Sequence, residues 1–471
     1  MPDVADELVA ASSTLTRRDL IRRGSAAAFA VGMFGGLSDK ALGFYGPLRF
    51  ANKQLAGDLR IMTWAHFVPA YDQWLDNTYV KQWGEANDVD VKVDHINNAL
   101  LYSTGASEVA AQSGHDLFWF ISPPSTFQKQ AIPVNDLVQE VSKKLGPMAR
   151  VARKATYNPR TKKFYGFPES YAPDPVQYRK SFLEQTGVSL NTWEDVRKGA
   201  PKLKAIGHPV GLGMSNEIDS NMLLTSLLYC YGGYIQKEAN RVVIGQGPNR
   251  KGAIEALKVM RDIYRNGMSD EVFAWTAASN NQAFLAGRLS MAVNAISIER
   301  SAEQSGNASL SDDSWLAAIP RGPAVRLGNE HVMGVYLIWK FAKNKEAAQK
   351  YVVDQQLGYR EHFLRSLYYN FPPWTGAIKG GFKEIRKLSA QDPHKPRGKY
   401  TVLTTIAENY TTNPGHPGNT TPVMDEIYNT FLIPQMFAQV AQGKSTPEAA
   451  VSAFASKAQS IYRKWRNQGL V

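Results

Sequence analysis

The chain has 471 residues, of which 44% are hydrophobic and 20% charged, and its formal net charge is +12. This length exceeds what one hydrophobic core usually organises, so two lobes or domains are expected, and the composition excludes large-scale disorder. The single cysteine, Cys230, excludes a disulfide framework and any cysteine-cluster metal site.

The basic residues are scattered and do not form a nucleic-acid-binding pattern. The densest run, from Lys379 to Lys399, is interrupted by Gly and Pro, and no RNA-recognition or helix-turn-helix motif accompanies it. We therefore expect a solvated basic face and no nucleic-acid partner.

The first residues have the pattern of an export signal. Arg17 and Arg18 precede a short, weakly apolar stretch, 26–37, and together they resemble a twin-arginine signal. We expect residues 1–57 to form this signal and a linker, and the protein to reach the periplasm already folded. The alternative is a basic amphipathic helix lying on a surface. No small-x-small cleavage site precedes Asp58, so membrane anchoring by a retained signal stays open.

The folded part begins with a predicted strand–helix series. Residues 59–64 and 89–95 alternate as strands do, and 116–121 form a short, fully apolar strand. Helical patterns at 71–85 and 103–112 separate these strands. The series predicts parallel βαβ units in a sheet that is covered on both faces.

A change of pattern follows. A strand at 164–168 is succeeded by an irregular, Pro-rich stretch at 171–178, and a capped helix then begins at Thr192, which indicates a lobe boundary. Helices are predicted for 192–206, 219–231, 249–266 and 279–286, and strands for 209–213, 289–294 and 315–319. Because strands again alternate with helices, the second lobe is expected to be α/β as well.

The last third is predicted to be mainly helical. A strand at 333–339 precedes a helix at 344–356, and a loop rich in Gly and Pro covers 411–422. The final stretch, 423–469, is predicted to be helical with a break at Pro434.

No enzyme motif is present in the sequence. There is no phosphate-binding loop, no nucleophile elbow, no metalloprotease motif and no dinucleotide fingerprint, and the eight histidines do not cluster at metal-ligand spacing. A catalytic triad that is assembled only in space would escape this search. We expect no enzymatic activity, no cofactor and no metal site.

Aromatic residues near the expected strand ends indicate a ligand site, because ligands bind beyond the carboxyl ends of strands in open α/β sheets. A sugar ring has an apolar face that a flat aromatic side chain covers and a hydroxyl rim that polar side chains bind. The aromatic candidates are Trp64, Trp119, Phe120, Tyr171, Trp275 and Trp374. The polar candidates are Asn216, Glu217, Asp219 and Asn294.

Six segments, taken in order, resemble the extracellular solute-binding proteins of the maltose-binding type (family 1). They are 59–64, 109–119, 163–168 with 192–195, 284–293, 334–352 and 442–449. The string Phe284-Leu-Ala-Gly-Arg-Leu-Ser-Met291 is the most specific of them. The likeness covers nearly all of residues 59–467.

The resemblance implies a periplasmic-binding-protein fold with two α/β lobes, a hinge and an interlobe cleft. Lobe I would comprise 58–175 plus 330–400, and lobe II would comprise 176–329 plus 401–471. The ligand would be a small molecule, most simply a sugar, and the partner a membrane-embedded ABC permease that reads the closed state of a monomer. By position, the resemblance assigns ligand contacts to Trp64, Trp119 or Phe120, Asn294 and Ser297, and to Glu217 and Asp219.

Two departures from the family narrow the ligand. Ala295 and Ile296 stand where maltodextrin binders have bulky aromatic residues, and Ala172 replaces an acid at a crossover. We therefore expect a small sugar, sugar alcohol or polar derivative rather than a long oligosaccharide. Two alternatives stay open. One is an anionic solute held by Arg288, Arg300 and Arg321, and the other is an exported cofactor-dependent enzyme.

Overall fold

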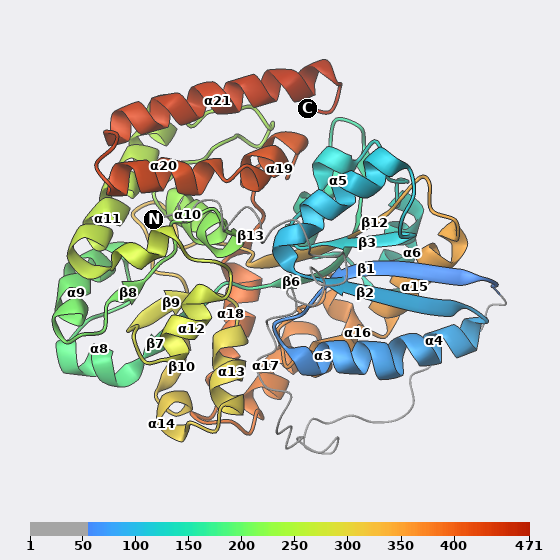
Figure 1. Ribbon diagram of the computed structural model, residues 1–471, viewed down its shortest axis with the longest axis horizontal. Helices are drawn as coiled ribbons and strands as arrows, with labels where there is room; N and C mark the ends of the chain where they lie inside the picture. The colour runs from blue at the N-terminus through green and yellow to red at the C-terminus, as the bar shows by residue number, and fades with distance from the viewer. Residues whose placement is uncertain (1–54) are drawn as a thin grey trace, which may run out of the picture. The chain divides into compact units, whose positions relative to one another are not determined.

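The computed structural model describes residues 55–471 (Figure 1). Arg17, Arg18 and the apolar stretch of the expected export signal lie outside the described residues, so the twin-arginine interpretation stays a prediction. Among the helices that are described, none is both long and apolar enough to cross a membrane.

The first sheet has five strands in the order β2-β1-β3-β12-β6. β1 (Asp58–Trp64) pairs in parallel with β2 (Asp90–Ile96) and β3 (Leu117–Phe120). β12 (Val332–Ile338) lies antiparallel between β3 and β6 (Phe167–Ala172). The predicted parallel βαβ arrangement of the first three strands is confirmed.

Helices cover both faces of this sheet. In Figure 1, α5 (Leu101–Ala111) lies on one side of the strands and α4 (Val80–Asn87) on the other. Every residue of β3 and β12 is buried, because a strand between two helix layers has no side that faces water. The other helices near this sheet are α3 (Pro69–Trp74), η1 (Leu75–Tyr79), α6 (Asn135–Leu145), α7 (Arg150–Thr156), α15 (Lys345–Leu357) and α16 (Tyr359–Arg365).

The second sheet has four strands in the order β10-β7-β9-β8. β7 (Val176–Arg179) pairs antiparallel with β10 (Ser314–Ala317) and with β9 (Met291–Val293), and β9 pairs in parallel with β8 (Val210–Gly211). Its helices are α8 (Lys180–Thr186), α9 (Trp193–Ala205), α10 (Ile218–Cys230), α11 (Gly247–Gly267), α12 (Ser279–Leu285), α13 (Ser297–Gln304) and α14 (Ala308–Ser311).

The C-terminal helices complete the core around the second sheet. α19 (Pro422–Asn429), α20 (Leu432–Ala441) and α21 (Pro447–Asn467) stand beside α10 and α11 in Figure 1. One buried apolar cluster joins residues of all five helices to residues of β7 and β9. The end of the chain is therefore tied to this half by its apolar side chains.

The start of α9 shows how local sequence fixes an element of this half. The Thr192 side chain accepts a hydrogen bond from the Asp195 N–H, and the Asp195 carboxylate accepts one from the Thr192 N–H. This capping box satisfies amide groups that have no partner inside the helix. The adjacent Trp193 is buried and anchors the first turn in the core.

Two of the stretches by which the chain passes between the two halves touch each other, and we call them the two crossings. Residues 173–175 connect β6 to β7, and residues 330–331 connect β11 (Gly328–Asn329) to β12. The His331 N–H donates to the Ala172 carbonyl over 2.9 Å, so the two crossings lie side by side. This is where a hinge between the sheets would act.

Two details of the predicted element map are wrong. The stretch 171–178 is not irregular, because β6 and β7 run into it from both ends and leave only 173–175 between them. Pro434 does not break a helix, since it lies in the first turn of α20, where its missing N–H has no helical partner to lose. The break lies at Phe431, which has a left-handed backbone with φ of 53°.

The helices between 359 and 409 were not predicted individually. The further elements are β4 (Tyr157–Asn158), β5 (Lys163–Phe164), β13 (Thr411–Thr412), α17 (Gly381–Ala390), α18 (Thr401–Asn409) and the short helices η2 (Asn98–Leu100), η3 (Ser125–Phe127), η4 (Asp270–Phe273) and η5 (Thr375–Ala377). The boundaries expected for the lobes, 58–175 plus 330–400 and 176–329 plus 401–471, stay a prediction.

Candidate functional site

A network of buried amide and carboxylate groups lies at the carboxyl end of β9. Asn294 donates from Nδ2 to Oδ1 of Asn281 over 2.7 Å and to Oδ1 of Asn280 over 3.0 Å. Its third contact, with Oδ2 of Asp219, is longer at 3.3 Å. Asn280 Nδ2 donates to the same Asp219 oxygen, and Asn281 Nδ2 donates to the Ser297 hydroxyl. We call these five residues the polar network.

The polar network is built from one strand and three helices around the second sheet. Asn294 directly follows β9, Ser297 begins α13, Asp219 lies in the first turn of α10, and Asn280 and Asn281 lie at the start of α12. Because helices begin where strands of this sheet end, short polar side chains from separate segments converge. The structure therefore brings together three residues that were predicted from the sequence, namely Asp219, Asn294 and Ser297.

The two crossings add charged groups to this network. His331 places Nδ1 at 2.9 Å from Oδ1 of Asp174 and Nε2 at 3.5 Å from Oδ1 of Asp219. Burial opposes a charge on the imidazole, but the carboxylates of Asp219 and Asp174 outweigh burial and raise the pKa of His331. Burial also raises the pKa of both aspartates, against the attraction of His331.

A cluster of rings from the first sheet adjoins this polar region. Trp64 stacks on Trp119 with ring centroids 5.2 Å apart and planes within 11°. His66 and Tyr369 contact Trp64 at centroid distances of 4.9 and 6.1 Å. The Trp119 indole N–H donates to Glu169 over 3.2 Å, which fixes that ring. We call Trp64, His66, Trp119 and Tyr369 the aromatic group.

Tyr369 connects the aromatic group to the charged groups. Burial raises the pKa of Tyr369, and the nearby carboxylates of Asp219 and Asp174 raise it further, so the phenol lies within their electrostatic field. Within residues 55–471, the Tyr369 hydroxyl and Oδ2 of Asp174 are both buried and have no hydrogen-bond partner. A buried polar atom without a partner costs about 1–3 kcal/mol, so a ligand that bonds these two oxygens would recover this free energy.

This arrangement can bind a small polar molecule. The rings offer flat apolar faces, while the amides, carboxylates and phenol offer hydrogen-bond donors and acceptors. Trp64, Trp119, Asp219 and Asn294 are all buried, although they come from different sheets. A ligand therefore reaches them only if the two sheets move apart, and it contacts both halves when they close again.

Two predicted aromatic residues lie elsewhere. Phe120 follows Trp119 in β3 and therefore points to the opposite face, where it packs on Phe118 at 4.7 Å and on Phe127 at 5.4 Å. Trp374 is 0% exposed, and its indole N–H donates to the Ser142 hydroxyl over 2.9 Å. Neither side chain joins the aromatic group or the polar network, and their assignment to the site stays a prediction.

Glu217 serves a local structural purpose beside the polar network. Its carboxylate accepts hydrogen bonds from the N–H groups of Asp219 and Ser220 and so caps α10. Burial raises the pKa of Glu217 to about 8, and the neighbouring Asp219 adds to the effect. It holds Asp219 in place through the helix that it caps.

Trp275 and Tyr171 lie at the margins of the candidate site. Trp275 belongs to the apolar core around the second sheet, and its carbonyl accepts a hydrogen bond from the Ser215 hydroxyl over 2.6 Å. Tyr171 exchanges backbone hydrogen bonds with Phe371, and in the described part of the chain its buried hydroxyl has no partner. Neither side chain joins the aromatic group or the polar network.

Sequence reasoning missed several residues of the site, namely His66, Asp174, Asn280, Asn281, His331 and Tyr369. Two signals were available. Asp174 stands between two prolines, Pro173 and Pro175, and the adjacent amides Asn280-Asn281 lie at the start of a predicted helix. His66 and Tyr369 carry no local signal.

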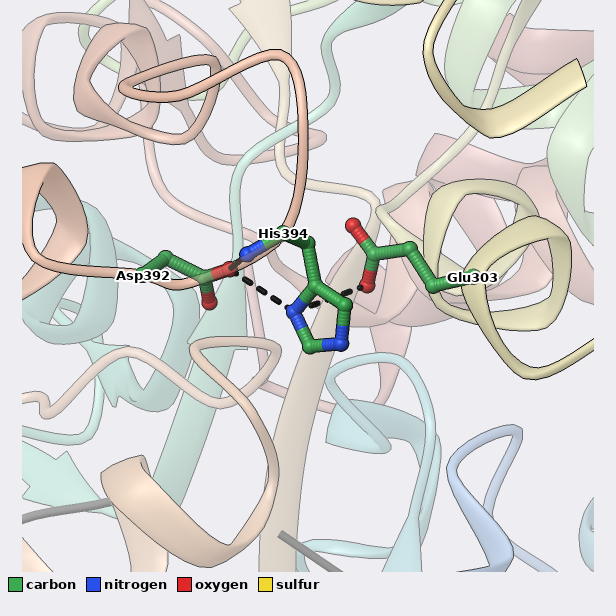
Figure 2. Close-up of side chains that lie close together, drawn as sticks. All are labelled: Glu303, Asp392 and His394. Atoms are coloured by element: carbon green, nitrogen blue, oxygen red, sulfur yellow. Dashed lines mark hydrogen bonds and ion pairs between the residues drawn. The ribbon is translucent and has the colours of Figure 1, made fainter. Parts of the chain in front are cut away.

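A second cluster of potential metal ligands lies apart from this site. Figure 2 shows His394 Nδ1 directed at Asp392 and Glu303, at 2.8 and 3.5 Å. The carboxylates already have cationic partners, since Arg300 lies 2.8 Å from Glu303 and 2.9 Å from Asp392. Lys399 contacts the other oxygen of Glu303 at 2.9 Å. The cluster is therefore a buried ion-pair network and fits a metal ion poorly.

Comparisons with known proteins agree with the fold. Residues 78–353 match the family model described as bacterial extracellular solute-binding protein. Among curated protein sequences none matches the chain. Maltose-bound MalE3 of T. maritima is 18% identical with a TM-score of 0.69, and the match covers 86% of this chain and 100% of that chain.

Two further solved structures are similar. A solute-binding protein of Thermotoga lettingae with bound α-D-tagatose is 15% identical with a TM-score of 0.68, over 86% of this chain and 99% of that chain. One of Agrobacterium radiobacter in complex with ribitol is 15% identical with a TM-score of 0.65, over 88% and 100%. The predicted two-lobed α/β fold is thereby confirmed.

Proposed function

Because the chain belongs to the bacterial extracellular solute-binding proteins, we propose that it is the substrate-binding component of an ABC importer and that it closes two lobes on a small sugar or sugar alcohol. One observation carries the proposal. Tyr369 contacts Trp64 of the first sheet, and burial and the carboxylates of Asp219 and Asp174 beside the second sheet raise its pKa. A flat ring beside hydroxyl-binding groups is what a sugar requires.

The proposal includes binding without catalysis. The similar proteins that carry maltose, tagatose and ribitol support a small polyhydroxylated ligand. A ligand that bridges both lobes favours the closed state, and a membrane-embedded permease would read that state. We further propose export to the periplasm by the twin-arginine route, function as a monomer, and the lobe boundaries given above.

The anionic alternative has little support at this site. Arg288 forms an ion pair with Glu271 over 2.9 Å, and Arg300 is held by Glu303 and Asp392. Arg321 is exposed. None of the three arginines is hydrogen-bonded to the polar network in the described residues, so a sugar acid or phosphate ester would find no arginine there.

Thermal unfolding in the presence of sugars and sugar alcohols tests the proposal. A ligand that binds only the folded protein stabilises it by about 2.7 kcal/mol at a hundredfold excess over Kd. The melting temperature should therefore rise with at least one sugar or sugar alcohol. No rise with any of them at millimolar concentration would contradict the proposal.

A matched pair of variants ties the effect to the site. Trp64→Leu removes a ring of the aromatic group, whereas Phe120→Leu removes a ring on the opposite face of the sheet. Both should lower the melting temperature without ligand. Only Trp64→Leu should abolish the rise that the ligand causes, and an equal loss in both variants would place the ligand elsewhere.

A further inference from the structure

The charged groups of the candidate site do not balance. Asp174 and Asp219 share a single cationic partner, His331. Among residues 55–471, no Lys or Arg forms an ion pair with either aspartate or with Glu217. When both carboxylates are ionised they face a single imidazolium, so one negative charge has no cationic partner, and burial accordingly raises the pKa of both acids.

Burial makes an ionised Asp174 costly unless a second cation lies beside it. Asp174 is 1% exposed, and while its Oδ1 faces His331, its Oδ2 has no hydrogen-bond partner within the described chain. An unpaired buried carboxylate is unfavourable unless a cation or several donors reach it. The protein therefore retains a strong acceptor at the point where the two crossings meet.

The rings beside this acceptor suit a cation as well. In the described part of the chain the Tyr369 hydroxyl, at 1% exposure, likewise has no hydrogen-bond partner. The segment that carries it contacts both halves, because Phe371 bonds Tyr171 of β6 and the Leu367 carbonyl accepts from Arg300 of α13. Burial and the carboxylates of Asp219 and Asp174 raise the pKa of Tyr369. Its ring adjoins Trp64, which stacks on Trp119. Indole and phenol faces attract ammonium groups through the ring quadrupole.

We propose that the ligand is a sugar or polyol that carries a positively charged amine. The ammonium would lie against Asp174 and the Tyr369 hydroxyl, beside the face of Trp64. The hydroxyl groups would reach the polar network around Asn294. This inference rests on the proposed function and narrows its substrate class. The same charge disfavours sugar acids and phosphate esters.

Calorimetry with matched ligand pairs tests the inference. The pairs are glucose with glucosamine, mannose with mannosamine, and sorbitol with 1-amino-1-deoxysorbitol. N-acetylglucosamine serves as a neutral amide of nearly the same shape. At least one amine should bind about tenfold or more tightly than its neutral counterpart, because a hydrogen bond to an ionised group is roughly twice as strong as a neutral one.

Variants locate the preference in the site. Asp174→Asn should reduce the preference for the amine over its neutral counterpart to below about threefold, because the substitution removes the charge of the side chain and keeps its shape. Asp219→Asn is the second variant if the first does not fold. Asp90→Asn, which neutralises an acid whose side chain is 63% exposed on β2, is the matched control and should keep the ratio.

The outcomes separate the two claims. If neutral members bind as tightly as amines, the charge inference is wrong and the proposed function stands. If no sugar or polyol of either kind binds, the proposed function itself is wrong. If putrescine, an amine without hydroxyl groups, binds as tightly as the best amino sugar, the polyol part of the inference is overturned.

Discussion

The pH dependence of stability depends on His66, a member of the aromatic group. Its Nδ1 accepts a hydrogen bond from the Val68 N–H over 2.8 Å, and its Nε2 lies 3.3 Å from the Asn370 carbonyl oxygen. A neutral imidazole with its proton on Nε2 therefore satisfies both contacts. A second proton would lie on Nδ1 and face the Val68 N–H, which is itself a donor. Burial accordingly lowers the pKa of His66 from 6.5 to about 4.

The sign follows from proton linkage. Because the folded pKa lies below the unfolded one, the unfolded state takes up a proton first as the pH falls. The contribution of the neutral His66 to stability is complete above pH 6.5 and is lost as the pH falls towards 4. Between pH 7 and pH 5, the loss from this residue is roughly 2 kcal/mol.

His66→Asn isolates this effect, because an Asn side chain can still accept the Val68 N–H two residues on. Urea unfolding measures the free energy of unfolding at pH 7 and at pH 5. Between these two values, the free energy of unfolding of the unchanged protein should fall by about 2 kcal/mol more than that of the variant. The half-buried His95–Asp72 pair is common to both proteins and cancels in the comparison. Equal losses, to within about 0.5 kcal/mol, would refute the assignment of a neutral His66.

Two further predictions concern buried polar contacts. Arg300→Met leaves the carboxylates of Glu303 and Asp392 without their guanidinium, and it should lower the free energy of unfolding by about 3–5 kcal/mol. A loss below about 1 kcal/mol in urea unfolding would contradict this reading of the ion-pair network. Asn294→Ala removes the three hydrogen bonds that Nδ2 donates, but it should lower the free energy of unfolding by only about 1–3 kcal/mol, the cost of one unsatisfied buried group. The reason is that, among the described residues, only Oδ1 of Asn281 loses its sole partner. The double variant with Asn281→Ala should be destabilised by less than the sum of the single losses, and strict additivity would argue against the contact.

Residue patterns predicted most strands of the two sheets. β2 alternates between its two faces, β3 is wholly apolar and wholly buried, and the Thr192 cap starts α9 where the sequence indicates. The prediction failed at Pro434, where the position of proline within a helix, rather than its presence, decides the outcome.

The sequence predicted those residues of the candidate site that follow the ends of strands. Asp219 and Asn294 follow strands of one sheet, so the rule for open α/β sheets brings them together. The aromatic residues were harder to predict, because neighbouring residues of a strand face opposite sides. Of Trp119 and Phe120, only the first can join Trp64, and the sequence does not indicate which.

The remaining site residues depend on contacts between distant segments. His66 and Asn370 are 304 residues apart in the chain and meet only in the folded protein. Asp174 and His331 lie in separate crossings, 157 residues apart. The net charge of +12 gave no indication of the acidic site, because total charge does not report where the charges lie.

Closure of the two lobes on a ligand is the central claim, and a distance between spin labels measures it. Lys92→Cys on β2 and Lys198→Cys on α9 place labels on side chains that are 59% and 71% exposed, one beside each sheet. Cys230 is buried and does not interfere. A saturating sugar or polyol, identified by calorimetry, should shift the distance distribution to a shorter and narrower form. An unchanged distribution at saturation would contradict the account.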